Sequence, residues 1–380
     1  MKVPPCSTWL EIDLDNLRAN TIRLREASGT ALMTVVKANA YGHGAVPVAR
    51  AAIDAGAAWC GVARVEEAIG LRRGEVQTPI LVLGYTPPDQ VVEALSHAIS
   101  LTIFDLELAR EYGQRAATAG GLVKVHLKVD TGMGRLGVRP EDAVGCLRKL
   151  LKLPGIEVQG LFTHFARADE PERPETLEQL SRFNDLLADI DRTGLRPELI
   201  HAANSAGTLN FPMARFDLVR CGIALYGLEP GPQSPLPSGF KPVLSWKARL
   251  ASRKKLPAGH GISYGHAYRT ARPSLVGVLP VGYADGFRRT NGNRALVGGR
   301  TVAVIGNVTM DQSMVQLDEV PDVGLQEEVV LIGRQGEAVI RAEDLARSWG
   351  TIAYEVVCGL AARLPRYYVE SGKLTHRISE

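Results

Sequence analysis

The sequence predicts an α/β protein, a (β/α)8 TIM-like barrel followed by a mostly antiparallel β domain. Short β-branched runs alternate with amphipathic stretches through the first part of the chain, as is typical of a parallel sheet built from βα units. A segment rich in proline, glycine and serine follows at residues 228–242, and short alternating runs separated by glycine and proline turns lie beyond it. With 380 residues the chain exceeds the size of a single core, so two domains are expected.

The barrel prediction depends on the number of its strands. They are short hydrophobic runs, expected at residues 32–36, 58–62, 79–83, 99–103, 122–129, 157–162, 198–202 and 217–225. The segments with helical spacing are 42–56, 64–73, 87–97, 105–118, 140–152 and 174–193, with a short helix from Asn204 and an additional one over 13–27. Eight strands with intervening helices predict a closed barrel.

The remaining part of the chain is expected to form a β domain with one helix. Its alternating runs lie at residues 243–250, 275–279, 294–297, 300–305, 313–317 and 328–332, and the helix lies near 341–349. The boundary is placed inside the proline-rich segment. Residues 1–236 are therefore expected to form the barrel domain and residues 237–380 the C-terminal β domain.

Composition argues against several classes of protein. The formal net charge is only +3 and no basic run is interleaved with aromatic residues, so neither nucleic acid nor a membrane surface is expected as a partner. The 5 cysteines are widely spaced and include no CxxC pair, which argues against a disulfide framework and a metal site. The N-terminal segment lacks the apolar core of a signal peptide, and no apolar run is long enough to span a membrane, so a cytoplasmic protein is expected.

A lysine at the end of the first barrel strand is the first candidate catalytic residue. In VVKANAYGHG (35–44) the strand ends at Lys37 and a glycine-rich turn follows. Barrel enzymes place catalytic groups at the carboxyl ends of their strands. Desolvation there lowers the pKa of a lysine, so its amine can form a Schiff base with an aldehyde cofactor. Position alone leaves open the alternative of an ordinary surface lysine.

The loops after the seventh and eighth strands have the features of a phosphate site. Asn204 and Ser205 open a helix after the seventh strand, and Gly222 and Ile223 follow Arg220 in the eighth segment. Barrel enzymes tend to bind phosphate with these two loops, and helix N-termini bind anions. The alternative for Ser205 is a helix N-cap without a ligand.

A series of motifs, in order across both domains, resembles the alanine racemase family. They are VVKANAYGHG, HLKVDTGMGRLG (126–137), LVRCGIALYG (218–227), GISYG (261–265), GYADG (282–286), MDQ (310–312) and TIAYEV (351–356). The resemblance implies an enzyme that uses pyridoxal 5'-phosphate to interconvert L-alanine and D-alanine. Such an enzyme supplies D-alanine for peptidoglycan or serves alanine catabolism.

The resemblance also implies a role for each matching residue. Lys37 would carry the cofactor and serve as one base, and Tyr264 would be the second base. Further cofactor contacts would come from Tyr41, His164, Asn204, Ser205, Arg220, Gly222, Ile223 and Tyr354. The substrate would be bound by Arg135, Met310 and Asp311, with support from Lys128, His201 and Tyr283. Lys128 is also a candidate for carbamylation that would orient Arg135.

The chemistry of racemisation explains the pairing of Lys37 with Tyr264 and the presence of Arg220. A proton leaves one face of the α-carbon and another arrives at the opposite face, so two bases are needed. An arginine stays protonated and cannot give a proton to the pyridine nitrogen, which favours racemisation over transamination. The alternatives are an ion-paired arginine inside the barrel and an ordinary tyrosine in a β turn.

Three other functions remain to be weighed against alanine racemisation. A decarboxylase of the same fold type would carry a glutamate where this chain has Arg220. A racemase of broader specificity is disfavoured by Tyr354 and by the missing secretion signal, and a non-catalytic cofactor-binding protein by the GISYG motif. In the family the tyrosine reaches in from the partner subunit, so the resemblance implies a homodimer in which Lys37 and Tyr264 of different chains share each active site.

Overall fold

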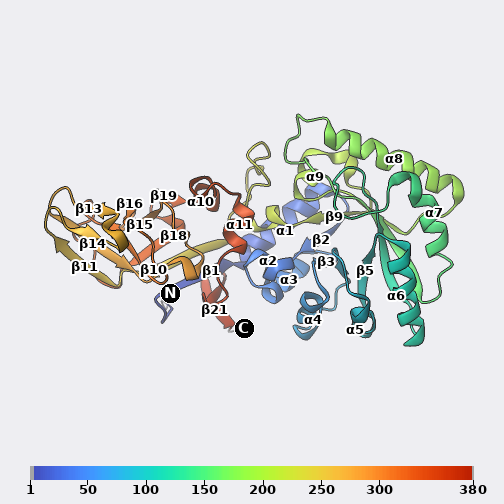
Figure 1. The fold of residues 1–380 in the computed structure, drawn as a ribbon, viewed down its shortest axis with the longest axis horizontal. Coiled ribbons are helices and arrows are strands. Elements are labelled where there is room, and N and C mark those ends of the chain that lie inside the picture. Colours follow the sequence, from blue (N-terminus) through green and yellow to red (C-terminus); the bar gives the residue numbers. More distant parts are fainter. Residues whose placement is uncertain (1–3, 379–380) are drawn as a thin grey trace. The chain divides into compact units, whose positions relative to one another are not determined.

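The computed structural model describes residues 4–378, which form two compact units (Figure 1). The first, here called the barrel unit, comprises Leu17–Ala40 and Ala45–Phe240. The second, here called the β unit, comprises the chain up to Asn16, Tyr41–Gly44 and the chain from Lys241 onward. The sequence analysis placed a single boundary at residue 236. It did not anticipate that the chain up to Asn16 and the segment Tyr41–Gly44 belong to the β unit.

The barrel unit contains the eight expected parallel strands. They are β2 (Ala31–Val35), β3 (Trp59–Val62), β4 (Ile80–Val82), β5 (Ile99–Ile103), β6 (Val123–Lys128), β7 (Ile156–Phe162), β8 (Leu199–His201) and β9 (Leu218–Cys221). Hydrogen-bonded neighbours follow the order β8-β7-β6-β5-β4-β3-β2-β9. The backbone N–H of Arg220 donates to the Ala203 carbonyl at 2.9 Å, beside the two end strands. The barrel is thus nearly closed, and the predicted fold class is confirmed.

Helices follow the strands of the barrel unit, and one further helix, α1, precedes the first strand (Figure 1). They are α1 (Leu14–Ser28), α3 (Ala45–Asp54), α4 (Val65–Arg73), α5 (Val91–Ser96), α6 (Leu106–Thr118), α7 (Pro140–Leu150), α8 (Glu175–Thr193) and α9 (Ser205–Asn210), with single 3-10 turns η1 (Pro88–Gln90), η2 (Pro212–Ala214) and η3 (Ile223–Tyr226). The sequence explains α6 well. Asp105 caps it by accepting from the N–H groups of Glu107 and Leu108, and Ala109, Tyr112 and Ala116 form its buried stripe.

Two predicted elements of the barrel unit are shorter than expected. The helix expected over 42–56 begins only at Ala45. Gly42 and Gly44 before it have positive φ, of 83° and 99°, which is not helical. Gly222, with φ −114° and ψ −93°, ends β9 after Cys221, where a strand to residue 225 was expected. Both interruptions lie next to predicted site residues.

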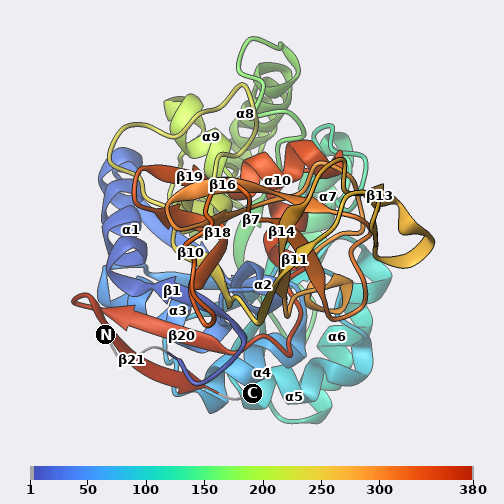
Figure 2. The same cartoon turned by 90° about the vertical axis from the view of Figure 1, so that its left-hand side faces the viewer.

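The β unit is built on one long sheet (Figure 2). Its order is β11-β14-β17-β16-β15-β18-β10-β1-β20-β21, and β1 pairs with β20 in parallel while the other pairs are antiparallel. The strands are β1 (Thr8–Asp13), β10 (Leu244–Arg249), β11 (Ser252–Leu256), β14 (Ser274–Leu279), β15 (Arg294–Val297), β16 (Arg300–Ile305), β17 (Ser313–Gln316), β18 (Glu328–Gln335), β20 (Arg366–Glu370) and β21 (Lys373–Ile378). The mostly antiparallel β domain is confirmed.

Smaller elements complete the β unit. β19 (Ala338–Ile340) pairs with β18, and β12 (Gly261–Ile262) pairs with β13 (Tyr268–Arg269). The expected helix near 341–349 is α10 (Ala342–Trp349), and a second one, α11 (Ala353–Cys358), was not expected. In the core of the unit Trp246 meets Phe287 edge to face at 5.7 Å between ring centroids.

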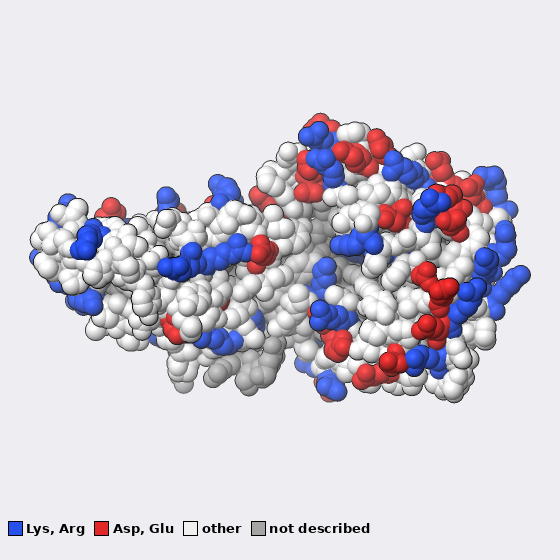
Figure 3. Space-filling view, in the orientation of Figure 1, with Lys and Arg blue, Asp and Glu red and all other residues white. Residues whose placement is uncertain are grey.

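The surface is of mixed charge. On the face in Figure 3, basic and acidic side chains are interspersed over the barrel unit, in keeping with the net charge of +3. Among residues 4–378, no helix combines the length and the apolar character needed to cross a bilayer. The cytoplasmic location stays a prediction.

Candidate active site

Lys37 lies directly after β2, where the backbone makes a left-handed turn. Residues 38–41 have φ between 51° and 53°, although none of them is glycine. Left-handed helical geometry costs L-residues about 1–2 kcal/mol each, so such a run persists only where other contacts hold it. The turn brings Lys37 to the carboxyl end of its strand, as the sequence analysis expected.

Two side chains of the barrel unit hold this turn. One oxygen of the Glu67 carboxylate accepts the N–H of Ala38 at 2.6 Å, and the other accepts the N–H of Ala63 at 2.7 Å. Asn39 accepts the N–H of Ala45 at 2.7 Å. Glu67 therefore ties the segment after β2 to the segment after β3. The sequence analysis missed Glu67. The one feature that could have pointed to it is an acidic residue in the first turn of a helix that follows a barrel strand.

Arg220 of β9 is buried and bonded to imidazole and carbonyl acceptors. Its Nη1 donates to Nδ1 of His201 at 2.9 Å, and its Nη2 donates to the carbonyls of Thr163 and Ala202 at 2.7 and 2.8 Å and lies 3.2 Å from Nδ1 of His164. All four contacts go to the Nη atoms, so Nε carries none of them. No carboxylate pairs with Arg220 among the residues that the structure describes, so the ion-paired alternative does not apply.

Burial keeps the histidines next to Arg220 neutral. Desolvation, followed by the charge of Arg220, lowers the pKa of both His164 and His201 well below the ordinary value. Desolvation also lowers the pKa of Arg220, to about 9, so the guanidinium still carries its charge at neutral pH. Arg220 is thus a permanent donor held by neutral acceptors.

Cations gather at this end of the barrel with little opposing charge. Lys128, at the end of β6, has a pKa lowered to about 8 by burial and by the charges of Arg135, Arg220 and Lys37. Asp130 is the one nearby carboxylate that raises it. Such an excess of positive charge fits a ligand that carries several negative charges.

The predicted phosphate residues come together where the loop after β9 is hydrogen-bonded to Ser205. The Ser205 hydroxyl accepts from the N–H groups of Gly222 at 2.9 Å and Ala224 at 3.3 Å, and Ile223 between them is buried. The helix cap is Asn204, whose side chain accepts the N–H of Gly207 at 2.8 Å. The alternative reading of Ser205 as an N-cap is therefore wrong, and its hydroxyl is directed at the loop after β9.

This arrangement fits pyridoxal phosphate. Because the Ser205 hydroxyl accepts from the N–H groups of Gly222 and Ala224, its own proton is available to a phosphate oxygen at the loop after β9. Lys37 would supply an amine for the aldehyde of such a cofactor, and Arg220 would supply a charged donor for its ring. The cation excess matches the charge of the phosphate and of an amino-acid carboxylate.

In the β unit, Tyr264 lies on an exposed turn, the 3-10 turn η4 (Tyr264–His266), and its side chain is 74% exposed. Ser263 and Gly265 on either side have φ of 63° and 67°. Asn307 donates from Nδ2 to the Tyr264 carbonyl at 2.9 Å, and its own carbonyl accepts from the Ser263 hydroxyl at 2.6 Å. The backbone is thus fixed while the phenol remains exposed.

The GYADG and MDQ motifs lie against each other in the β unit. The N–H of Tyr283, in the turn η5 (Tyr283–Asp285), donates to the Thr309 carbonyl, and the N–H of Ala284 donates to the Met310 carbonyl, both at 3.0 Å. A Cβ on Gly282 would lie 2.2 Å from that Met310 oxygen, so this position requires glycine. Tyr283 and Met310 are both exposed.

Arg363 links these two motifs and was missed by the sequence analysis. Its Nε donates to Asp285 at 2.7 Å and its Nη2 donates to Asp311 at 2.8 Å. Asp285 is buried and also accepts the N–H of Gly282. Arg363 therefore fixes the position of Asp311, one of the predicted substrate residues.

Tyr41 and Tyr354 also approach each other within the β unit. Their ring centroids are 6.1 Å apart at an interplanar angle of 48°. Tyr354 belongs to α11, and a Cβ on Gly42 would lie 2.3 Å from the carbonyl oxygen of Val357 in the same helix. The close approach of Gly42 places Tyr41 beside this helix.

The predicted site residues thus form two groups, one in each unit. The barrel unit brings together Lys37, Lys128, Arg135, His164, His201, Asn204, Ser205, Arg220, Gly222 and Ile223. The β unit contains Tyr41, Tyr264, Tyr283, Met310, Asp311 and Tyr354.

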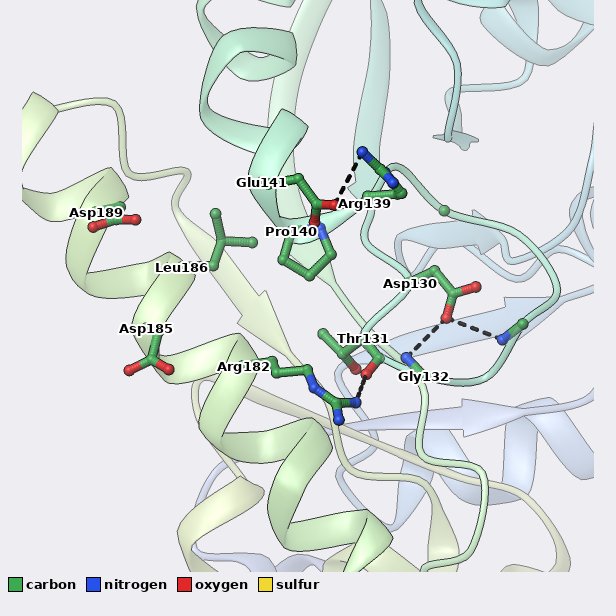
Figure 4. A pocket seen from close by; sticks show the side chains of 12 residues that line it. Asp130, Thr131, Gly132, Arg139, Pro140, Glu141, Arg182, Asp185, Leu186 and Asp189 are labelled. Atoms are coloured by element: carbon green, nitrogen blue, oxygen red, sulfur yellow. Dashed lines mark hydrogen bonds and ion pairs between the residues drawn. The ribbon is translucent and has the colours of Figure 1, made fainter.

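The loop that carries Arg135 borders a separate surface cavity of about 650 Å³ (Figure 4). Asp130 accepts three N–H groups of the loop, from residues 132–134, and Arg182 of α8 donates to the Thr131 carbonyl at 2.8 Å. The cavity lies between this loop and the helices α7 and α8. Its lining contains none of the predicted site residues, but its walls hold the Arg135 loop in place.

Comparison with known proteins agrees with the fold and with the motifs. Residues 12–230 match the family described as "Alanine racemase, N-terminal domain", and residues 243–368 match "Alanine racemase, C-terminal domain". The chain is 50% identical over 364 residues to the alanine racemase of Symbiobacterium thermophilum, covering 95% of this chain and 97% of that protein. It is 44% identical over 365 residues to the alanine racemase of Halothermothrix orenii, covering 95% and 96%.

Solved structures give the same result. The alanine racemase of Clostridium difficile 630 superposes with a TM-score of 0.93 at 36% identity, covering 99% of each chain. Alanine racemase from D-cycloserine-producing Streptomyces lavendulae superposes with a TM-score of 0.92 at 41% identity, covering 97% of this chain and 98% of the other. The chain belongs to the alanine racemase family.

Proposed function

We propose that this chain interconverts L-alanine and D-alanine, with pyridoxal 5'-phosphate bound at Lys37. The observation that carries the proposal is the buried Arg220, which is charged, has only donors and is held by neutral histidines in a cluster of cations that includes Lys37. Family membership supports the same activity. The D-alanine would serve peptidoglycan synthesis, or the enzyme would serve alanine catabolism.

The residues of the barrel unit would bind and orient the cofactor. Pyridoxal phosphate, when bound, supplies an electron sink that acidifies the α-proton of an amino acid. Lys37 would hold its aldehyde carbon, and the Ser205 hydroxyl with the loop of Gly222 and Ile223 would hold its phosphate. Nε of Arg220 would face the ring nitrogen. Because arginine does not release its proton at neutral pH, it stabilises the ring without protonating it.

Two bases would move the protons. The Lys37 amine would take or return the α-proton on one face of the substrate, and the Tyr264 phenol would do so on the other face. Arg135 would bind the substrate carboxylate, with its loop held by Asp130 and Arg182. The other predicted residues would close the site around the small side chain of alanine.

We also propose that the protein is a homodimer with shared active sites. Tyr264 is 74% exposed and belongs to a different unit from Lys37. A two-fold dimer would pair Lys37 of one subunit with Tyr264 of the other, as the family resemblance implies.

The activity is tested by incubating purified protein with L-alanine, with and without added pyridoxal phosphate, and measuring D-alanine. Its absence under both conditions would exclude the proposal. The same assay with L-serine tests the broader racemase, and release of carbon dioxide from amino acids tests the decarboxylase.

Complementation between two inactive variants tests the shared site. Lys37→Ala and Tyr264→Ala chains, mixed equally and refolded together, give mixed dimers in about half of all dimers, each with one native and one doubly defective site. Activity should therefore recover to about a quarter of the wild-type value. Mixed dimers, confirmed with two affinity tags, that remain inactive would refute the shared site.

A further inference from the structure

A line of polar side chains crosses the interior of the barrel from Arg220. Nη1 of Arg220 contacts Nδ1 of His201 at 2.9 Å, and Nε2 of His201 contacts Nδ1 of His126 at 2.9 Å. Nε2 of His126 lies 3.4 Å from Oε1 of Gln159, which also accepts the hydroxyl of Ser100 at 3.1 Å. The five residues come from β9, β8, β6, β7 and β5, in that order.

The direction of every hydrogen bond in this line follows from its first member. A guanidinium has donors and no acceptor, so Nδ1 of His201 must accept and its proton must lie on Nε2. That proton is donated to Nδ1 of His126, whose own proton therefore lies on Nε2 and points to Gln159. The Gln159 oxygen receives two donors, from His126 and Ser100, and ends the line.

The packing fixes the two imidazole rings in this geometry. The ring of Phe162 stacks on His201, with centroids 4.7 Å apart and planes at 4°. Trp59 meets His126 edge-on at 5.5 Å. A Cβ on Gly160 would lie 2.3 Å from Nδ1 of His126, so the ring occupies the space that glycine leaves open. These contacts leave the rings little freedom to turn over and exchange their donor and acceptor atoms.

Every group in the line after Arg220 is neutral. Both histidines are fully buried, and desolvation lowers the pKa of His126 to about 4. The line ends on a neutral amide. A carboxylate at position 159 would favour a doubly protonated His126, whose Nδ1–H would then face the Nε2–H of His201.

We propose that His126 and Gln159 are positioning residues whose neutrality keeps the proton of His201 on Nε2, so that its Nδ1 always accepts from Arg220. The link to the cofactor rests on the proposed function, because Arg220 acts there through its contact with the ring. The tautomers themselves are properties of this chain whether or not it racemises alanine.

The test is a two-bond ¹H–¹⁵N correlation spectrum of the holoenzyme labelled with ¹⁵N-histidine. The sequence has 8 histidines, and His126→Asn and His201→Asn identify the two signals of interest. We expect both residues to be protonated on Nε2 alone at neutral pH. A wild-type His201 protonated on Nδ1, or on both nitrogens, would overturn the proposal without bearing on the wild-type racemase assay.

A pair of variants at position 159 tests the role of the neutral end. Gln159→Glu should protonate both nitrogens of His126 and shift the His201 proton to Nδ1, while Gln159→Met, which is of similar size and uncharged, should leave His201 protonated on Nε2. With Arg220 deprived of its acceptor, kcat in Gln159→Glu should fall about tenfold or more, the value of a hydrogen bond to a charged group. Unchanged tautomers in folded Gln159→Glu would refute the proposal. If that variant does not fold, the wild-type spectrum decides.

Discussion

Acid should destabilise the barrel through its buried histidines, and His126 gives the clearest case. Its pKa falls from the ordinary 6.5 to about 4 on folding, because the fully buried ring loses its hydration when charged. Between these two values the unfolded chain binds a proton that the folded chain does not. The stabilising contribution is therefore complete above pH 6.5 and is lost as the pH falls toward 4.

The size of the effect follows from the shift. A difference of 2.5 pKa units corresponds to about 3 kcal/mol in the free energy of unfolding, of which about 2 kcal/mol is lost between pH 7 and pH 5. His201 and His164 act in the same direction, since burial also lowers their pKa values. His126→Asn removes one of these groups while an amide oxygen remains available to His201.

The measurement is the free energy of unfolding of the holoenzyme in urea at pH 7, 6 and 5. Wild type should lose about 2 kcal/mol more than His126→Asn over this range, whatever the difference in their stability at pH 7. His260 is exposed and serves as the matched control, so His260→Asn should follow wild type. Equal losses in wild type and His126→Asn would show that His126 is not a buried neutral group.

Three further substitutions test the site directly. Lys37→Ala should abolish activity and the visible absorbance of bound cofactor, and a reducible cofactor adduct at another lysine would contradict this. Arg220→Glu should slow racemisation and increase pyruvate formation from alanine, because a carboxylate can share a proton with the ring nitrogen. Normal racemisation without pyruvate formation would mean that Arg220 does not contact the ring. Glu67→Ala should lower the free energy of unfolding by about 1–3 kcal/mol, measured in urea, because the N–H groups of Ala38 and Ala63 lose their acceptor, and an unchanged value would mean that other groups hold the left-handed turn.

The sequence predicts the barrel strands well because each is a local feature. In β5 (Ile99–Ile103), for example, the whole β-branched run is buried, and the capped helix α6 with its apolar stripe follows it. β1 was missed because it shows no such local pattern. Its residues Trp9, Leu10 and Ile12 are buried by pairing with β10 and β20, which lie more than 200 residues away in sequence.

The candidate site shows the same contrast between local and distant information. Lys37, Ser205 and Arg220 could be proposed from their places at strand ends and from motifs. Ser100 and Gln159 could not, because nothing in their own strands marks them, and their contact joins β5 to β7, the two strands on either side of β6. The sequence of β6 does indicate a polar barrel interior. His126 and Lys128 are separated by one residue, so both side chains lie on the same face of the strand.

The chemistry of residue 220 and that of the barrel interior are physically coupled. Arginine can only donate, so each partner along the line must present an acceptor toward it, and the line keeps this direction as long as its far end carries no charge. Gln159 meets this requirement, and a carboxylate there would not. A carboxylate at position 220 would make the opposite demand, because it accepts hydrogen bonds and would favour a protonated His201. A change between arginine and glutamate at position 220 therefore requires a matching change in the protonation of His201 and of the residues behind it.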